Sequence, residues 1–334
     1  MLCIELKKMV ETVLKAADPA ELSNVQPLAK DFIETPERLV FAVVENGQEQ
    51  GKVLCFLRYI FQNTGWEKVN TDQSNQYLTE NHPHYLYFSP NKQAHCHAVE
   101  LGQIAKHHQP KVQLKKILDS DATDEVEKDL QLLCQGFAKQ GFDLDEIGVT
   151  GSILISAQNN QSDIDLVFYS RISFNKAREV IKRLIKEGIC SELSNSDWLD
   201  SYDRRSCDLT FDEYVWHEKR KFNKALINHR KFDLSFVSQD KQCSSVSYKK
   251  LHFVKLQVEV SEDFLGFDYP AEFAINHAEI QSIVCYTATY TGQAFKGEQI
   301  EVAGQLEVSS EGIQRIVVGS SREATGEYIK VSNV

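Results

Sequence analysis

The sequence lacks several features that would place it in a familiar class. No apolar run reaches the roughly 18 residues of a membrane-spanning helix, and no signal-peptide pattern follows Met1. The chain contains no Cys-x-x-Cys pair, and its 8 cysteines are scattered singly, which suits a reducing compartment better than a disulfide framework. These absences argue against a membrane partner and a secreted disulfide scaffold, so we expect a cytoplasmic protein.

Positive charge is also scarce. The chain has 37 Lys and Arg against 48 Asp and Glu, and its net charge of −11 argues against a protein that coats nucleic acid with its whole surface. A polyanion would have to be steered by a local basic patch. With 42% hydrophobic and 25% charged residues, the chain is otherwise typical of a folded protein, and its 334 residues leave room for two or three domains.

The most informative stretch covers residues 147–169. A short apolar run ends at Gly151-Ser152, where a strand would pass into a helix, and Asp163 and Asp165 follow in a second apolar run. Alternate side chains of a strand share a face, so the two carboxylates lie together and repel each other. Mg²⁺ removes the repulsion, since it takes carboxylate oxygens and substrate phosphates as ligands. Gly151 lets the backbone approach a ligand, and a helix N-terminus offers N–H groups to an anion. The stretch predicts a phosphate-binding turn beside a metal site.

The order of these residues resembles the signature of the DNA polymerase β-like nucleotidyltransferase superfamily. On this resemblance, Gly151 and Ser152 form the phosphate-binding turn, and Asp163 and Asp165 bind the metal. The superfamily needs a third acid on a later strand, and Asp233 is the candidate, because its neighbours on both sides are apolar at alternate positions.

The resemblance implies an α+β protein whose nucleotidyltransferase palm is a mixed sheet with helices on one face and carboxylates on the other. We expect the palm at residues 119–240, an N-terminal α+β domain of unknown role at 1–118, and a C-terminal β-barrel-like domain, OB-like in type, at 241–334. The chain as a whole is similar to a group of predicted nucleotidyltransferases best known from archaea. They share an N-terminal segment like residues 31–44, a basic segment like 217–224 and a glycine-rich β tail.

Hydrophobic periodicity predicts individual elements within these segments. In the C-terminal segment, short strands punctuated by glycine predict the barrel, and its acidic balance favours a structural or dimerisation role over nucleic-acid binding. The expected helices cover 4–17, 112–118, 124–140 and 177–187, and the expected strands outside the 147–169 stretch cover 39–44, 53–59, 85–88, 231–236, 253–260, 283–290, 299–308, 314–318 and 328–331.

Residues 213–231 form a second stretch of interest, rich in Lys and Arg. Drawn as one helix, His217, Arg220, Lys221 and Lys224 share a face at i, i+3, i+4 and i+7. Cations shortly before the third acid would hold a triphosphate or the backbone of an acceptor nucleic acid. A solvated basic face is the alternative.

Histidines crowd residues 82–108. Their spacings match none of the paired patterns that are typical of zinc sites. We therefore expect ordinary surface or loop histidines there.

The resemblance implies two-metal nucleotidyl transfer. Asp163 and Asp165 would hold one Mg²⁺ or Mn²⁺ ion and, with Asp233, a second ion that lowers the pKa of the attacking hydroxyl. Gly151 and Ser152 would bind the β and γ phosphates of a nucleoside triphosphate. The cations expected at the leaving pyrophosphate are Arg220, Lys221 and Lys224.

The expected product is a nucleoside monophosphate attached to a hydroxyl of RNA, DNA, a protein or a small molecule. The alternative is a non-catalytic module in which the palm binds a nucleotide or RNA. The β domain would then form a homodimer or dock a partner.

Overall fold

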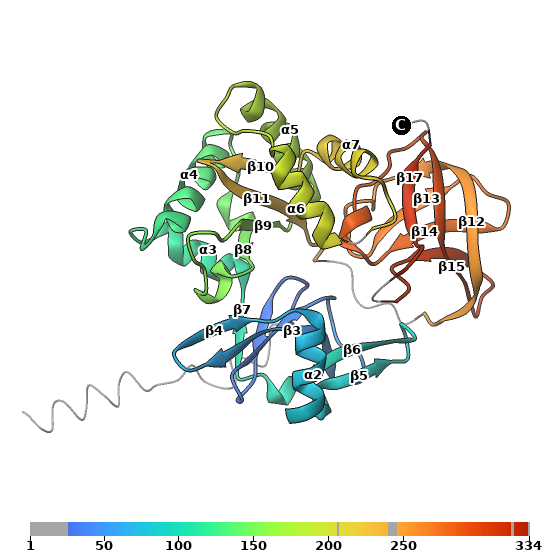
Figure 1. Cartoon of the computed structure of the whole chain (residues 1–334), viewed down its shortest axis with the longest axis horizontal. Helices are drawn as coiled ribbons and strands as arrows, with labels where there is room; N and C mark the ends of the chain where they lie inside the picture. The colour runs from blue at the N-terminus through green and yellow to red at the C-terminus, as the bar shows by residue number, and fades with distance from the viewer. Residues whose placement is uncertain (1–25, 206, 240–245, 322–323, 333–334) are drawn as a thin grey trace, which may run out of the picture.

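The computed structural model describes residues 26–205, 207–239, 246–321 and 324–332. Within them lie three β-sheets and the helices around them, so the protein is of the α+β class, as expected (Figure 1). The helix expected over residues 4–17 lies outside the described residues. Each sheet is built from one part of the chain: residues 32–108, 147–236 and 248–331.

The N-terminal sheet has the order β5-β6-β3-β2-β1-β7, with β4 paired to β3. The expected hairpin is confirmed, since β2 and β3 pair antiparallel. The register of that pair shifts: Val40 faces Tyr59 and Phe41 faces Leu57, which leaves Arg58 as the extra residue of a β-bulge. The elements are β1 (Phe32–Glu34), β2 (Leu39–Val43), β3 (Lys52–Gln62), β4 (Gly65–Lys68), α2 (Thr71–Asn81), β5 (Leu86–Ser89), β6 (Ala94–Glu100) and β7 (Lys106–His108).

The central sheet has the order β10-β11-β9-β8. It is mixed, because β9 and β11 run parallel while the other pairs are antiparallel. Ile164, Leu166 and Phe168 are fully buried on one face, where three helices cover them, and the carboxylates take the other face. The elements are α3 (Pro110–Leu118), α4 (Glu125–Lys139), β8 (Ile147–Thr150), β9 (Ile164–Phe168), α5 (Arg171–Lys186), β10 (Lys224–Ile227) and β11 (Arg230–Phe236).

Local sequence explains the limits of these helices. Asp124 caps α4 by accepting a hydrogen bond from the Glu127 N–H, as expected, and Gly188 follows α5 with a left-handed φ of 72°. Helix α3 was expected in the N-terminal domain, yet its buried Leu114 and Ile117 pack in the core of the central sheet. A Cβ at Gly148 would lie 2.6 Å from the Cβ of Pro110, so glycine in β8 is what lets α3 pack this closely.

The expected helix over 213–231 is only half correct. Helix α7 (Phe211–Lys221) begins with a capping box between Thr210 and Glu213 and ends at Phe222, which has a left-handed φ of 50°. The following residues form β10, which pairs with β11. Ala225 and Ile227 are buried at alternate positions, so pairing with the sheet overrides the helical spacing of the charged residues.

The C-terminal strands form a closed ring. Strand β12 pairs with both β13 and β15, and the ring order is β12-β13-β14-β16-β15, with β17 added beside β15. The expected strand 283–290 ends early, at Cys285, and is followed by a 3₁₀ turn (Ala288–Tyr290). The strands are β12 (Tyr248–Glu262), β13 (Ala271–Ile275), β14 (Ile280–Cys285), β15 (Gln299–Ser309), β16 (Gln314–Val318) and β17 (Tyr328–Val331).

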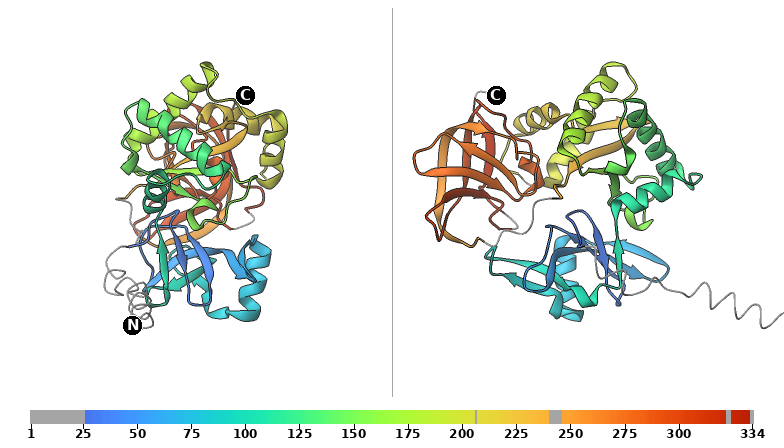
Figure 2. Two further views of the ribbon diagram at one scale, coloured as in Figure 1. Left: turned by 90° about the vertical axis from the view of Figure 1, so that its left-hand side faces the viewer. Right: turned by 180° about the vertical axis from the view of Figure 1, so that it is seen from behind.

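The N-terminal sheet lies below the other two parts in Figure 1 and again when the molecule is seen from behind (Figure 2). Helices α6 (Asn195–Arg205) and α7 lie between the central sheet and the barrel, and Trp198 and Tyr214 pack in the barrel core. Among the described residues, no helix is both long enough and apolar enough to cross a membrane.

Candidate functional site

The three acids expected at the metal site lie on the same face of the central sheet. Asp165 in β9 stands directly opposite Asp233 in β11, in parallel register, and adjacent strands are ~4.8 Å apart. Asp163 precedes Asp165 by two residues and therefore points to the same side. The same row of the sheet continues to Lys224 beyond Asp233 and to Thr150 beyond Asp165.

Gly151 touches this row. Its φ of 70° lies in the left-handed region, and a Cβ added to it would lie 2.5 Å from Oδ2 of Asp165. Glycine is required here twice, by the backbone conformation and by the approach of the carboxylate. Ser152 then begins a single 3₁₀ turn (Ile153–Ile155) instead of the expected α-helix. The phosphate-binding role expected for a helix N-terminus therefore rests on this turn alone.

The acids are electrostatically uncompensated at short range. Burial raises the pKa of Asp165 to about 6, and the charge of Asp233 adds to the shift, while Lys30 opposes it. Burial within the pocket raises the pKa of Asp163 as well, again with a contribution from Asp233. Among the described residues, no Lys, Arg or His nitrogen lies within 4.0 Å of the three carboxylates.

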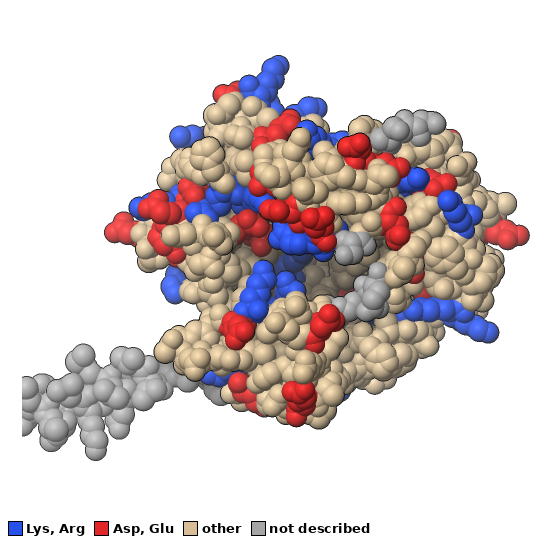
Figure 3. Space-filling view, viewed as in Figure 1, with Lys and Arg blue, Asp and Glu red and all other residues tan. Residues whose placement is uncertain are grey.

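Basic side chains surround the acids at longer range. A pocket of about 260 Å³ opens beside Asp163 and Asp233, and its wall contains Arg204 and Arg205 from the end of α6. Figure 3 shows Lys and Arg gathered at the central hollow, although the protein as a whole is acidic. The other cations of this group are Lys224 and Lys231 in the pocket wall and Lys30, Arg58 and Lys68 from the N-terminal part.

Lys30 reaches the central sheet on a tightly held segment. It has a left-handed φ of 75°, its N–H donates to the Val43 carbonyl at 3.0 Å, and its own carbonyl accepts a hydrogen bond from the Thr150 hydroxyl at 2.7 Å. The preceding Ala29 packs with Val167 of β9 on the carboxylate face. The Lys30 side chain is in contact with solvent, but the surrounding protein lowers its pKa by partial desolvation, against the attraction of Asp165.

Of the cations expected from the 213–231 stretch, Lys224 remains at the site. It stands opposite Asp233, and its ammonium group contacts Glu218. Lys221 is buried and contacts both Glu218 and the Thr289 carbonyl of the barrel segment. The ammonium of Lys221 is therefore already bound within the protein.

Arg220 also makes contacts away from the acids. It forms an ion pair with Glu298 and lies over the rings of Trp216 and Phe295, at 4.4 and 4.3 Å from their centroids. Arg220 and Lys221 lie on the helix that was expected, but their side chains are held by contacts with Glu298, Glu218 and the barrel segment, away from the acids. Both residues instead join the central part to the barrel.

Six of the basic residues at the hollow were not expected there from the sequence. The adjacent pair Arg204-Arg205 offered a local signal, and so did Lys231, which lies two residues before the third acid. The other three offered none, because Lys30, Arg58 and Lys68 lie in the N-terminal part and reach the acids only through tertiary packing.

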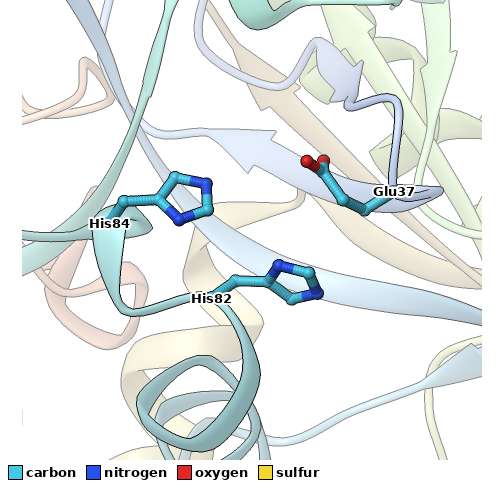
Figure 4. Close-up of side chains that lie close together, drawn as sticks. All are labelled: Glu37, His82 and His84. Atoms are coloured by element: carbon cyan, nitrogen blue, oxygen red, sulfur yellow. The ribbon is translucent and has the colours of Figure 1, made fainter.

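The crowded histidines are not ordinary surface residues throughout. His97 is buried and accepts the Leu57 N–H, and the His107 and Asp31 side chains form a buried pair at 2.7 Å. Two others, His82 and His84, gather beside Glu37 (Figure 4). The ligand atoms of these three residues lie within 4.8 Å of one another.

The chain is similar to an uncharacterized protein, MJ1086, of Methanocaldococcus jannaschii. The two are 33% identical over an alignment 346 positions long, which covers 90% of this chain and 98% of the relative. No family model matches the chain, and no solved structure is similar to it. Because the likeness extends over nearly the full length of both proteins, the chain belongs to the same family as the uncharacterized archaeal protein MJ1086.

Proposed function

We propose that this protein is a nucleotidyltransferase, which moves a nucleoside monophosphate from a nucleoside triphosphate to a hydroxyl acceptor. The observation that carries the proposal is the row formed by Thr150, Asp165, Asp233 and Lys224 across the mixed sheet, with Gly151 in contact with Asp165. Asp233 is far in the sequence from Asp163 and Asp165, and the sheet brings it opposite Asp165 beside a glycine turn. On this proposal the central part, residues 119–240, is a nucleotidyltransferase palm.

The flanking parts fit the same proposal. The ring of five strands in the C-terminal part is a small closed barrel of the kind that includes OB folds. Its contacts with α7, among them the ion pair of Arg220 with Glu298, support a structural role for the barrel, because they fix the helix next to the palm.

The donor atoms present fit divalent cations. Asp163, Asp165 and Asp233 would hold them, since hard cations prefer oxygen ligands and these carboxylates have no ion-pair partner of their own among the described residues. Bound Mg²⁺ or Mn²⁺ would polarise the α-phosphate and lower the pKa of the attacking hydroxyl.

The chain's own groups bind the substrates and accept the proton. Arg204 and Arg205 line the pocket and are placed to bind the phosphates, whereas Lys231 in the same wall forms an ion pair with Asp197 at 2.9 Å. Asp233 accepts the hydroxyl proton of the acceptor. The acceptor oxygen then forms a bond to the α-phosphorus, the bond to the bridging oxygen of the β-phosphate breaks, and pyrophosphate leaves.

Transfer of label from each α-labelled nucleoside triphosphate tests the proposal. The acceptors are total RNA, DNA oligonucleotides and the protein itself, in the presence of Mg²⁺. We expect Asp163→Asn and Asp165→Asn to lower transfer at least about a thousandfold, since metal sites contribute several kcal/mol to such steps. Asp145→Asn is the matched control, because Asp145 is exposed and lies outside the site.

The outcomes separate the two hypotheses. Transfer that survives both Asp substitutions would rule out this site as the source of activity. Mg²⁺-dependent binding of nucleotide without any transfer would favour the non-catalytic nucleotide- or RNA-binding module.

A further inference from the structure

We propose that the N-terminal sheet forms the second wall of the active-site hollow and binds the phosphodiester backbone of a single-stranded nucleic acid through Lys30, Arg58 and Lys68. The role of that strand as the acceptor rests on the proposed nucleotidyl transfer. The binding itself does not.

Packing between the N-terminal sheet and the central part determines the position of this wall. Tyr59 of β3 is buried with Leu154 and Ile155, which belong to the turn that follows Gly151 and Ser152. Lys68 of β4 stands directly opposite Tyr59 in the antiparallel pair. The N-terminal sheet therefore contacts the central part beside the expected phosphate-binding turn, and Lys68 contributes to the electrostatic field at Asp163 and Asp165.

Arg58 occupies an irregular position. It is the extra residue of the β-bulge between β2 and β3, next to Tyr59. A bulge interrupts the ladder and redirects a side chain, and bulges are over-represented next to active sites. The guanidinium is close enough to Lys30 to lower its pKa, although two like charges gain nothing from such proximity.

Lys30 has an unfavourable backbone conformation as well. A left-handed φ is uncommon for a residue with a Cβ, and it costs free energy that the hydrogen bonds to Val43 and Thr150 must offset. The segment thus holds a lysine beside two carboxylates at some cost. That arrangement has an evident use only if a ligand completes it.

None of the three cations has a carboxylate within 4.0 Å among the described residues. This is notable in a chain with 48 Asp and Glu and a net charge of −11. Arg204 and Arg205 on the opposite wall serve the triphosphate. The N-terminal cations therefore remain for a second polyanion, and an extended phosphodiester chain can contact all three.

Binding of a fluorescein-labelled 15-nucleotide RNA, and of DNA of the same sequence, to the full chain tests the proposal by fluorescence anisotropy. The double variant Arg58→Gln/Lys68→Gln is compared with Arg183→Gln/Lys186→Gln. The control pair lies exposed on α5, which covers the opposite face of the sheet, and removes the same charge. Dissociation constants are measured from 50 to 200 mM KCl, without nucleotide.

We expect the Arg58→Gln/Lys68→Gln substitutions to weaken binding about tenfold. They should also reduce the slope of log affinity against log salt concentration by about 1.4, since each lost phosphate contact contributes ~0.7 for single strands. The arm with the tighter binding identifies RNA or DNA as the ligand. Equal affinities for the two double variants would overturn the proposal.

The failure of this proposal can be told from the failure of the proposed function. If no acceptor is labelled but the Arg58→Gln/Lys68→Gln substitutions still weaken binding, the proposed nucleotidyl transfer is refuted and the nucleic-acid-binding wall is supported. If label is transferred and the two substitutions change neither RNA or DNA binding nor the amount of labelled product, the binding wall is refuted and the nucleotidyl transfer is supported.

A separate cluster carries a second proposal. We infer that Glu37, His82 and His84 bind a transition-metal cation of the Zn²⁺ type. Their ligand atoms lie within 4.8 Å of one another, and the ligands of one zinc ion are separated by up to ~4 Å, so small side-chain rotations complete the set. Two imidazoles and a carboxylate on one ion also leave a position for water or a substrate.

The backbone around this cluster is fixed. His82 ends α2 and its N–H donates to the Leu78 carbonyl at 2.8 Å, while Pro83 limits the chain between the two histidines. The buried Tyr85 donates its hydroxyl to Oε2 of Glu37 at 2.9 Å and orients the carboxylate, as outer ligands do in metal sites.

Calorimetric titration of the full chain with Zn²⁺ tests this site, in excess Mg²⁺ so that the carboxylate site is filled. We expect one Zn²⁺ to bind and Glu37→Gln/His84→Gln to weaken it at least about tenfold. His95→Gln, at another exposed histidine, should leave the affinity unchanged. Equal affinities for the wild type and the double variant would overturn the assignment.

Discussion

Two clusters of charge meet at Lys224, which stands opposite Asp233 and contacts Glu218, and they differ in how their charges are balanced. In the first, Glu218 is buried between the ammonium groups of Lys221 and Lys224. Burial alone would raise the pKa of Glu218, but the two cations outweigh it and hold the pKa at about 2. This cluster satisfies its charges within the protein and joins α7 to the central sheet.

The second cluster leaves its charges unsatisfied. Asp163, Asp165 and Asp233 repel one another, and the nearest cations stand back from them at the walls of the hollow. A protein gains no stability from such an arrangement, because like charges in a confined site oppose folding. The difference teaches that the basic residues near the acids are of two kinds. Lys221 and Lys224 are paired with Glu218 inside the protein, whereas Arg204 and Arg205 have no carboxylate within 4.0 Å among the described residues.

Removal of Glu218, the acid that Lys221 and Lys224 share, should have the largest effect on stability, because it breaks the paired cluster. Glu218→Gln would leave two buried lysines without a counter-charge, and we expect a loss of about 3–5 kcal/mol in the free energy of unfolding. Chemical denaturation measures it. The control is Glu192→Gln, which removes the exposed partner of Lys219 on the same helix and should cost at most about 1 kcal/mol. Similar losses for both would contradict the structural role of Glu218.

Acid should weaken the paired region through His217. This buried ring contacts the Glu213 carbonyl through Nδ1 at 2.7 Å and accepts the Val331 N–H at Nε2 at 3.0 Å, and burial lowers its pKa to about 4. Because the folded pKa lies below the unfolded value of ~6.5, the stability from neutral His217 is complete above ~6.5 and is lost as pH falls towards 4.

The measurement is the free energy of unfolding of the wild type and of His217→Gln between pH 7 and pH 4. We expect the wild type to lose about 2–3 kcal/mol more than the variant over this range. Parallel pH profiles would show that the ring becomes protonated without cost.

Gly151→Ala tests the second cluster, because Gly151 lies next to the Asp165 carboxylate. The added methyl group meets both an unfavourable φ and the Asp165 carboxylate at 2.5 Å, whereas Gly188→Ala meets a φ of 72° and nothing within 4 Å. We expect Gly151→Ala to cost about 1–3 kcal/mol more than Gly188→Ala, and to lower Mg²⁺ affinity as Asp165 is displaced. Equal costs in denaturation would mean that the backbone conformation alone requires glycine.

The smallest predicted effect is a gain in the free energy of unfolding instead of a loss. The folded pKa of Asp165, about 6, lies above its unfolded value, so the ionised carboxylate opposes folding, and this penalty develops as pH rises from ~4 to ~6. Without metal at pH 7, Asp165→Asn should therefore stabilise the protein, by about 1 kcal/mol, less than the ~1.4 kcal/mol per pKa unit of a fully buried group because solvent screens this partly exposed residue. The gain should vanish below about pH 4. A destabilised variant at pH 7 would show that Asp165 makes a structural contact instead.

Much of the site could be predicted because the sequence of a single strand shows which of its side chains share a face. Alternation of apolar and acidic residues over Ile164–Phe168 and Arg230–Phe236 determines which side chains point to the core. It predicted that Asp163 and Asp165 share a face, while Asp233 was joined to them by the family resemblance, and the structure places Asp233 opposite Asp165. The requirement for Gly151 was visible for the same reason, since a turn next to a strand needs a residue without a Cβ.

The helical interpretation of residues 213–231 holds as far as Lys221 and fails beyond it for a related reason. Charged residues at helical spacing and apolar residues at strand spacing overlap at Lys224–Ile227, and a local pattern cannot rank them. The partner strand β11 decides, because it buries Ala225 and Ile227.

By itself, the sequence determined strands β8, β9 and β11 of the central sheet, the faces of their carboxylates and the glycine beside them, because these follow from the period of the backbone. Only the tertiary structure decided which cations serve the acids. Lys30, Arg58 and Lys68 reach the hollow because Tyr59 and Ala29 pack on the central part, and Arg220 and Lys221 are withdrawn from it because the barrel and Glu218 bind them. The physical reason is that a long side chain pairs with whatever charge the packed fold brings within a few ångströms, at any distance along the chain.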